Sequence, residues 1–142
     1  MDSTLLLIPC SEDMNREESI ALHRPKIPHI SNQEKDSETL QFQNTVLRQV
    51  IKYQHNIIIA YFRSYLNKRK LDLSMLDEHK QMQVIRDAFL KDSKLKVLFE
   101  GIIIGQLSVA EYEVFCSAEA ELKKRIRDII KQRIQDSLEQ LL

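Results

Sequence analysis

The clearest candidate chemistry in this chain of 142 residues is a basic run near the C-terminus, KKRIRDIIKQR, at residues 123–133. Lys124, Arg127 and Lys131 recur at positions i, i+3 and i+7, which share one face of a helix. Such a face can bind phosphate groups, but it can also simply be solvated. We favour the solvated face, because no aromatic residue is interleaved for base stacking.

A second motif-like stretch is FEGIIIGQLSVAEYEVF, at residues 99–115, which holds both glycines of the chain. Its spacing does not fit a phosphate-binding loop, which needs G-x-x-x-x-G-K-[ST]. We predict that Gly105 ends a helix in the left-handed conformation, and that Ser108 and Glu111 form a capping box that begins the next helix. Gly101, inside the first of these helices, is predicted to permit close packing against a neighbouring backbone.

The remaining candidates for chemistry are isolated side chains. His55 follows an apolar face and is predicted to be a hydrogen-bonded core residue. Cys116 is predicted to be a buried structural thiol, and Asp77-Glu78-His79 point in different directions on a helix, so they cannot easily share one metal ion. We therefore predict no catalytic, metal-binding or cofactor-binding residues, and an enzyme is only the third of our functional hypotheses.

Composition favours an all-helical protein, because the chain has only two glycines and three prolines, and the tight turns between strands of a sheet commonly need these residues. The 21 basic and 21 acidic residues cancel, so the whole chain has no strong field that would attract nucleic acid or anionic lipid. The charge is unevenly distributed, with eight acids and four bases in residues 1–38. Two cysteines make no disulfide framework, which is typical of a reducing cytoplasm.

The prolines and the apolar periodicity divide the chain into two parts. All three prolines precede residue 30, and residues 1–35 are predicted to be a flexible or loosely docked acidic tail. Residues 36–142 are predicted to form a single helical domain, a bundle in which two long helices, 36–69 and 109–141, are separated by two shorter ones. The longest apolar run, IIIAYF at 57–62, is too short to span a membrane.

The apolar middle of the first long helix is broader than a single stripe. The residues that could form an oligomer interface there are Ile57, Ile58, Ile59, Tyr61 and Phe62. Because an exposed patch of this size is unusual on a monomer, we expect a homodimer. The function expected from these features is protein–protein interaction as a homo-oligomeric adaptor or structural factor. The alternative is a nucleic-acid-associated accessory protein that uses its basic helix faces.

The run GIIIGQLSVAEYEVF followed by KKRIRDIIKQRIQDSL resembles the C-terminal part of a family of small, uncharacterised all-helical bacterial proteins. The resemblance covers less than half of the chain. It implies a cytoplasmic bacterial protein, and it implies no particular activity and no functional residues.

Overall fold

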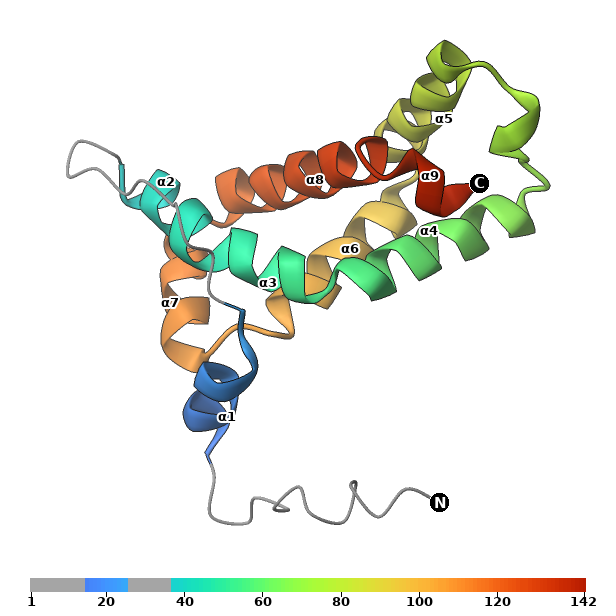
Figure 1. Cartoon of the computed structure of the whole chain (residues 1–142). Helices are drawn as coiled ribbons and strands as arrows, with labels where there is room; N and C mark the ends of the chain where they lie inside the picture. The colour runs from blue at the N-terminus through green and yellow to red at the C-terminus, as the bar shows by residue number, and fades with distance from the viewer. Residues whose placement is uncertain (1–14, 26–36) are drawn as a thin grey trace, which may run out of the picture.

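The fold of the described residues, 15–25 and 37–142, is all-α in this computed structural model, which confirms the predicted fold class (Figure 1). No strand occurs among these residues. The elements are α1 (Arg16–His23), α2 (Glu38–Phe42), a π-helical segment η2 (Gln43–Leu47), α3 (Arg48–Tyr53), α4 (His55–Lys68), a 3-10 turn η3 (Leu73–Met75), α5 (Glu78–Lys91), α6 (Ser93–Ile104), α7 (Val109–Ser117), α8 (Glu119–Gln135) and α9 (Leu138–Leu141).

Helices α5, α6 and α7 each begin directly after a side chain that caps the helix N-terminus. The Asp77 side chain accepts a hydrogen bond from the Lys80 amide at the start of α5, and Asp92 accepts one from Leu95 at the start of α6. Ser108 and Glu111 form the predicted capping box of α7, with both hydrogen bonds present. These side chains satisfy amide groups that a helix leaves without partners at its N-terminus.

The two predicted long helices are not continuous. The first is divided by the π-helical segment and by a non-helical residue, Gln54 (φ −89°, ψ 8°), which separates α3 from α4. The second breaks at Ala118 (φ −144°, ψ 47°), between α7 and α8. Neither residue is a helix breaker by type, and each makes a tertiary contact. The Gln54 side chain donates to the Ile102 carbonyl oxygen at 3.2 Å, and Ala118 packs against the hydrophobic core. At Ala118 the chain bends, so that α7 and α8 run in different directions (Figure 1).

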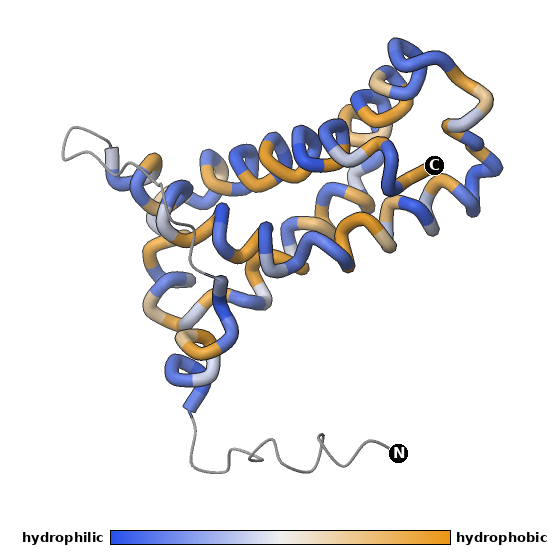
Figure 2. Tube along the Cα trace, in the orientation of Figure 1, coloured by the Kyte–Doolittle hydropathy of each residue, from blue (hydrophilic) through white to orange (hydrophobic). Residues whose placement is uncertain are grey.

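The core lies where α5 and α6 pack against α8, with α4 on its other side. Hydrophobic residues alternate with polar ones along each of these helices (Figure 2). The stripe of α8 that faces inward is fully buried and consists of Leu122, Ile126, Ile130 and Ile134. Phe89 and Phe99 stack at 5.6 Å between ring centroids, and Phe62 stacks on Phe89 at 6.4 Å, so aromatic rings join α4, α5 and α6.

The proposed interface residues in α4 belong mostly to this core. Ile58 and Phe62 are 0% exposed and Ile59 is 4% exposed, Tyr61 is half-buried, and only Ile57, at 51%, faces solvent. The premise of a large exposed patch is therefore wrong. The broad apolar face exists because α4 is covered by neighbours within the same chain.

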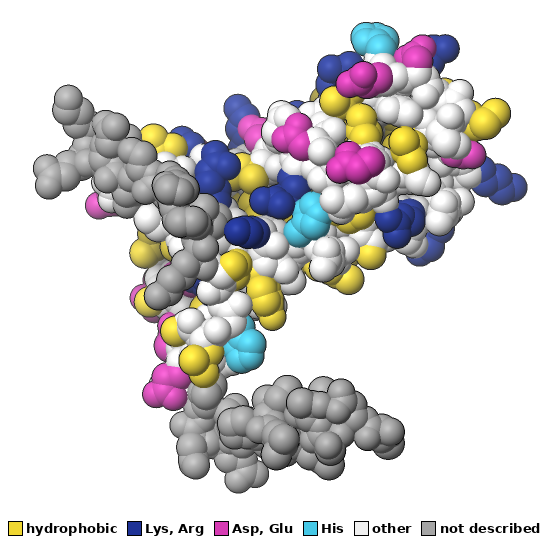
Figure 3. All heavy atoms as spheres, viewed as in Figure 1, with side chains coloured by type: hydrophobic (Ala, Val, Ile, Leu, Met, Phe, Trp, Pro, Cys, Tyr) yellow, Lys and Arg dark blue, Asp and Glu magenta, His cyan; other side chains and the backbone are white. Residues whose placement is uncertain are grey.

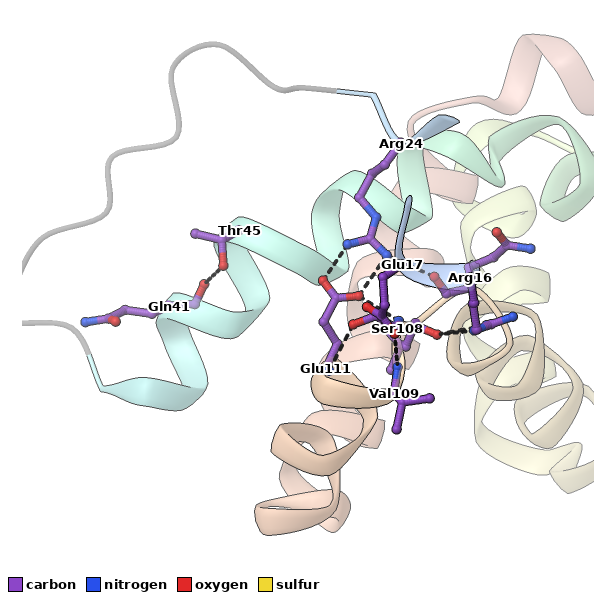
Figure 4. Close-up of polar contacts among 10 residues, drawn as sticks. Arg16, Glu17, Arg24, Gln41, Thr45, Ser108, Val109 and Glu111 are labelled. Atoms are coloured by element: carbon purple, nitrogen blue, oxygen red, sulfur yellow. Dashed lines mark hydrogen bonds and ion pairs between the residues drawn. The ribbon is translucent and has the colours of Figure 1, made fainter. Parts of the chain in front are cut away.

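Part of the predicted tail is a docked helix. Arg16 of α1 donates hydrogen bonds to the carbonyl oxygens of Leu107 (2.8 and 3.1 Å) and Gly105 (2.6 Å). Arg24 forms an ion pair with Glu111, at 2.5 and 2.9 Å, and the Glu17 carboxylate accepts from the Val109 amide (Figure 4). Polar contacts to the α6–α7 loop and to the first turn of α7, rather than apolar burial, hold this segment. Residues 1–14 and 26–35 of the predicted tail lie outside the described part.

The two glycines have roles that differ from those predicted. Gly105 does lie directly after α6, but its φ of −61° is right-handed, so the left-handed cap is absent. A methyl group on Gly105 would lie 3.1 Å from the Gly101 carbonyl oxygen. Gly101 itself is exposed, and an added methyl group would meet no atom within 4 Å, so the predicted close packing is wrong.

Candidate functional site

Helix α8 carries most of the basic side chains that the structure gathers. Its sequence EAELKKRIRDIIKQRIQ repeats an apolar residue every four positions, and this stripe is buried. The remaining positions hold six lysines and arginines, which project to either side of the stripe. One set faces α5 and α6, and the other faces η2 and α3.

The first hollow, which we call the α5–α8 groove, has a volume of about 390 Å³. Its walls come from α5, α6 and α8, and its lining residues are Arg86, Phe89, Leu90, Lys96, Lys124, Arg127, Asp128 and Lys131. Five of these eight are basic and one is acidic. A chain with no net charge therefore concentrates positive charge in one groove.

Most of these cations lack an acidic partner. Lys96, Lys124 and Lys131 form no ion pair with any described residue, and Arg86 donates to the Gln83 side chain at 3.0 Å. Arg127 is different, because it pairs at 3.2 Å with Glu100, a carboxylate of α6 that is only 7% exposed. The groove thus offers cations without an acidic partner in the described part of the chain, from three helices, around one structural ion pair.

The second hollow, which we call the α3–α8 pocket, has a volume of about 640 Å³. Its lining residues are Gln43, Arg48, Glu121, Lys124, Arg125, Asp128, Ile129, Gln132, Arg133, Asp136 and Ser137. Lys124 and Asp128 line both hollows, so they form the ridge between them. Basic side chains gather on the face that Figure 3 shows, along the seam between α8 and the α3–α4 segment.

Hydrogen bonds connect α8 to the opposite wall at both ends of the α3–α8 pocket. Arg125 donates to Gln43 at 2.6 Å and to Glu121 at 2.8 Å. At the other end, Arg133 donates to Nδ1 of His55 at 3.2 Å, so that His55 must donate from Nε2 to the Gln140 side chain, 2.9 Å away. His55 is hydrogen-bonded as predicted, although it is half-buried at the pocket's edge rather than in the core.

The three predicted basic residues do lie together, and the structure adds partners that the sequence analysis missed. Lys124, Arg127 and Lys131 share the α5–α8 groove with Arg86 and Lys96, which are distant in sequence. The sequences of α5 and α6 do not distinguish these two residues from the other cations, because only the packing of α5 and α6 against α8 brings them close. The basic cluster at residues 68–70 does not join them. Its Arg69 pairs with Asp92 at 2.6 Å and lies over the Tyr65 ring.

The other sequence candidates show no shared chemistry. Cys116 is exposed, contrary to the prediction of a buried thiol, because α7 buries only its neighbour Phe115. Within residues 15–25 and 37–142, no group of three potential metal ligands comes together. In the same residues, no helix is both long enough and apolar enough to cross a membrane.

Comparisons with protein-family models, with curated proteins and with solved structures found no match to this chain. Its function must therefore be inferred from its own geometry and charge.

Proposed function

We propose that this protein is a protein-interaction module whose α5–α8 groove binds an acidic, partly apolar segment of a partner protein. The observation that carries the proposal is the lining of the groove, where four basic side chains without an acidic partner among the described residues, Arg86, Lys96, Lys124 and Lys131, share the groove with one lining acid, Asp128. Complementary charge steers a partner toward such a surface and selects against partners of the wrong sign.

The apolar part of the groove lining favours a protein over a single-stranded nucleic acid. Leu90 is 73% exposed at the end of α5, beside the buried ring of Phe89. Aliphatic surface framed by cations suits a segment that alternates carboxylates with apolar side chains. Sites for single-stranded nucleic acid instead present aromatic rings on which bases stack, and Phe89, only 6% exposed, does not offer one.

The test measures binding of fluorescent probe peptides to the full chain by anisotropy. One peptide is built from Glu and Leu, and a second has Ser in place of Leu. We expect the Glu–Leu peptide to bind more tightly, because only its leucines can pack against the exposed Leu90 side chain. The substitutions Lys96→Glu and Lys131→Glu, on opposite walls, should together weaken binding by about tenfold or more.

A matched control distinguishes groove binding from general attraction. Lys52→Glu with Lys68→Glu makes the same charge change at exposed sites on α3 and α4 that do not line the groove. Equal weakening by both double variants would refute a groove-specific site. A short DNA duplex is the third probe. Tighter binding of the duplex, falling steeply between about 50 and 200 mM salt, would favour the nucleic-acid alternative instead.

The partner could also be a second copy of the chain. The homodimer and the cytoplasmic location expected from the sequence stay predictions, and sedimentation velocity at micromolar concentration tests the first. The buried positions of Ile58 and Phe62 remove the original argument for the dimer, so a dimer would have to use another surface.

A further inference from the structure

We propose that the α3–α8 pocket is a binding site for a small phosphate monoester, held by Arg48, Arg125 and Arg133. This site is separate from the α5–α8 groove and does not depend on the function proposed for it. The pocket's volume of about 640 Å³ falls within the range of small-molecule sites in proteins.

One wall of the pocket is formed by η2 and α3, and the other is formed by α8. Their arrangement brings the three arginines into one row. Gln43 contacts Arg125, and further along both segments His55 contacts Arg133. The two segments therefore run in the same direction, as Figure 1 shows, and Arg48 on α3 falls between the two arginines of α8. Guanidinium groups thus reach one pocket from opposite walls.

The positive charge of this row is incompletely neutralised. Arg48 and Arg133 form no ion pair with a described carboxylate. Arg48 makes one side-chain hydrogen bond, to Asn44 at 3.3 Å, and Arg133 makes one, to His55. The pKa of Arg133 is lowered mainly by burial and secondarily by repulsion from Arg48, whereas attraction to Asp136 raises it. Two such like charges are stabilised when an anion lies between them.

The three carboxylates of the pocket compensate only in part for its four cations. Glu121 is paired with Arg125, and Asp136 accepts a hydrogen bond from the Gln132 side chain at 2.9 Å. Asp128 is exposed on the ridge between the two hollows.

The number of donors favours phosphate over carboxylate. A carboxylate has two oxygens, whereas a phosphate monoester presents three oxygens and close to two negative charges near neutral pH. Three planar guanidinium groups from two walls match the larger anion, and Arg is the residue that binds phosphate in bidentate geometry. Beside them, Ile129 and Gln132 leave room for the uncharged part of the ligand.

Isothermal titration of the full chain with glycerol 3-phosphate tests the site, with glycerol and with chloride at matched ionic strength as controls. We expect saturable binding of glycerol 3-phosphate and none of glycerol. Arg48→Gln should raise the dissociation constant by about tenfold or more, because one charge-assisted contact is lost. Arg48 is exposed and makes a single side-chain hydrogen bond, so this variant should keep the helical circular dichroism of the wild type.

The control is Arg86→Gln, which removes the same charge from the α5–α8 groove and should leave the dissociation constant within about twofold. Equal weakening by Arg48→Gln and Arg86→Gln, or no binding by the wild type, would overturn the proposal. A second arm uses phosphatidylcholine vesicles with and without phosphatidic acid. Tighter binding to the phosphatidic acid vesicles than to glycerol 3-phosphate would assign the pocket to a lipid headgroup and refute a soluble ligand.

Discussion

Arg127 of α8 and Glu100 of α6 form an ion pair of 3.2 Å across the helix interface, and the Glu100 side chain is almost completely buried. Arg127 is thus a structural residue within an otherwise unpaired basic groove. The sequence placed it with Lys124 and Lys131 on one solvated face, but the three side chains have different neighbours. Removing Arg127 would leave a carboxylate buried without its partner.

We predict that Arg127→Ala lowers the free energy of unfolding by about 2 kcal/mol. Breaking a fully buried pair costs about 3–5 kcal/mol, and the value here should be smaller because the Arg127 side chain remains 34% exposed. Lys124→Ala and Lys131→Ala should each stay within about 0.5 kcal/mol of the wild type. Urea unfolding measures all three. Glu100→Gln should reduce the cost of Arg127→Ala, and an unchanged cost would rule out the charge as its cause.

We predict that the docking of α1 weakens in acid. Burial alone would raise the pKa of Glu111, but hydrogen bonds from Arg24 and the Ser108 amide, together with the Arg24 charge, hold that pKa below its ordinary value of 4.5. A lowered folded-state pKa contributes stability above 4.5, and that stability is lost as the pH falls through the folded-state pKa. Glu111→Gln keeps an oxygen for the Ser108 amide and loses the charge that pairs with Arg24.

At pH 7 this variant should therefore be less stable than the wild type by about 1 kcal/mol, and the gap should close toward pH 3. Urea unfolding at several pH values provides the comparison, and carboxyl NMR gives the Glu111 midpoint directly. Arg24→Gln should shift that midpoint upward. A midpoint unaffected by Arg24 would mean that α1 does not dock through this pair.

The two glycines should respond oppositely to alanine. Gly101 is an exposed helical residue with open space where a methyl group would lie, so Gly101→Ala should stabilise the protein by about 0.5–1 kcal/mol through helix propensity. Gly105 has a right-handed backbone, but its added methyl group would lie 3.1 Å from the Gly101 carbonyl oxygen. Gly105→Ala should therefore be neutral or mildly destabilising. Denaturant midpoints decide the signs, and a destabilised Gly101→Ala would contradict the open environment described here.

Adjacent isoleucines in α4 should have very different effects on stability. Ile58 is fully buried and Ile57 is half-exposed. Ile58→Ala should lower the free energy of unfolding by about 2–5 kcal/mol, whereas Ile57→Ala should cost less than about 1 kcal/mol. Chemical denaturation of the two variants at several protein concentrations makes the measurement. A large, concentration-dependent effect of Ile57→Ala would show that this side chain is buried in an oligomer.

The sequence by itself determined the fold class and the local helix signals. Scarce glycine and proline, helical apolar periodicity and side-chain caps act over a few residues, and they located α5 and α6 and the start of α7 at Ser108. The apolar stripe of α8 and the three basic positions beside it also follow from local periodicity.

Only the tertiary structure decided where charges and apolar faces meet. Arg86 and Lys96 join Lys131 because α5 and α6 pack on α8, and Arg48 faces Arg133 because α3 runs beside α8. The breaks at Gln54 and Ala118 are equally non-local, since neither residue opposes a helix by its own chemistry. Burial of Ile58 and docking of Arg24 on Glu111 likewise depend on partners far along the chain, and such contacts leave no period in the sequence.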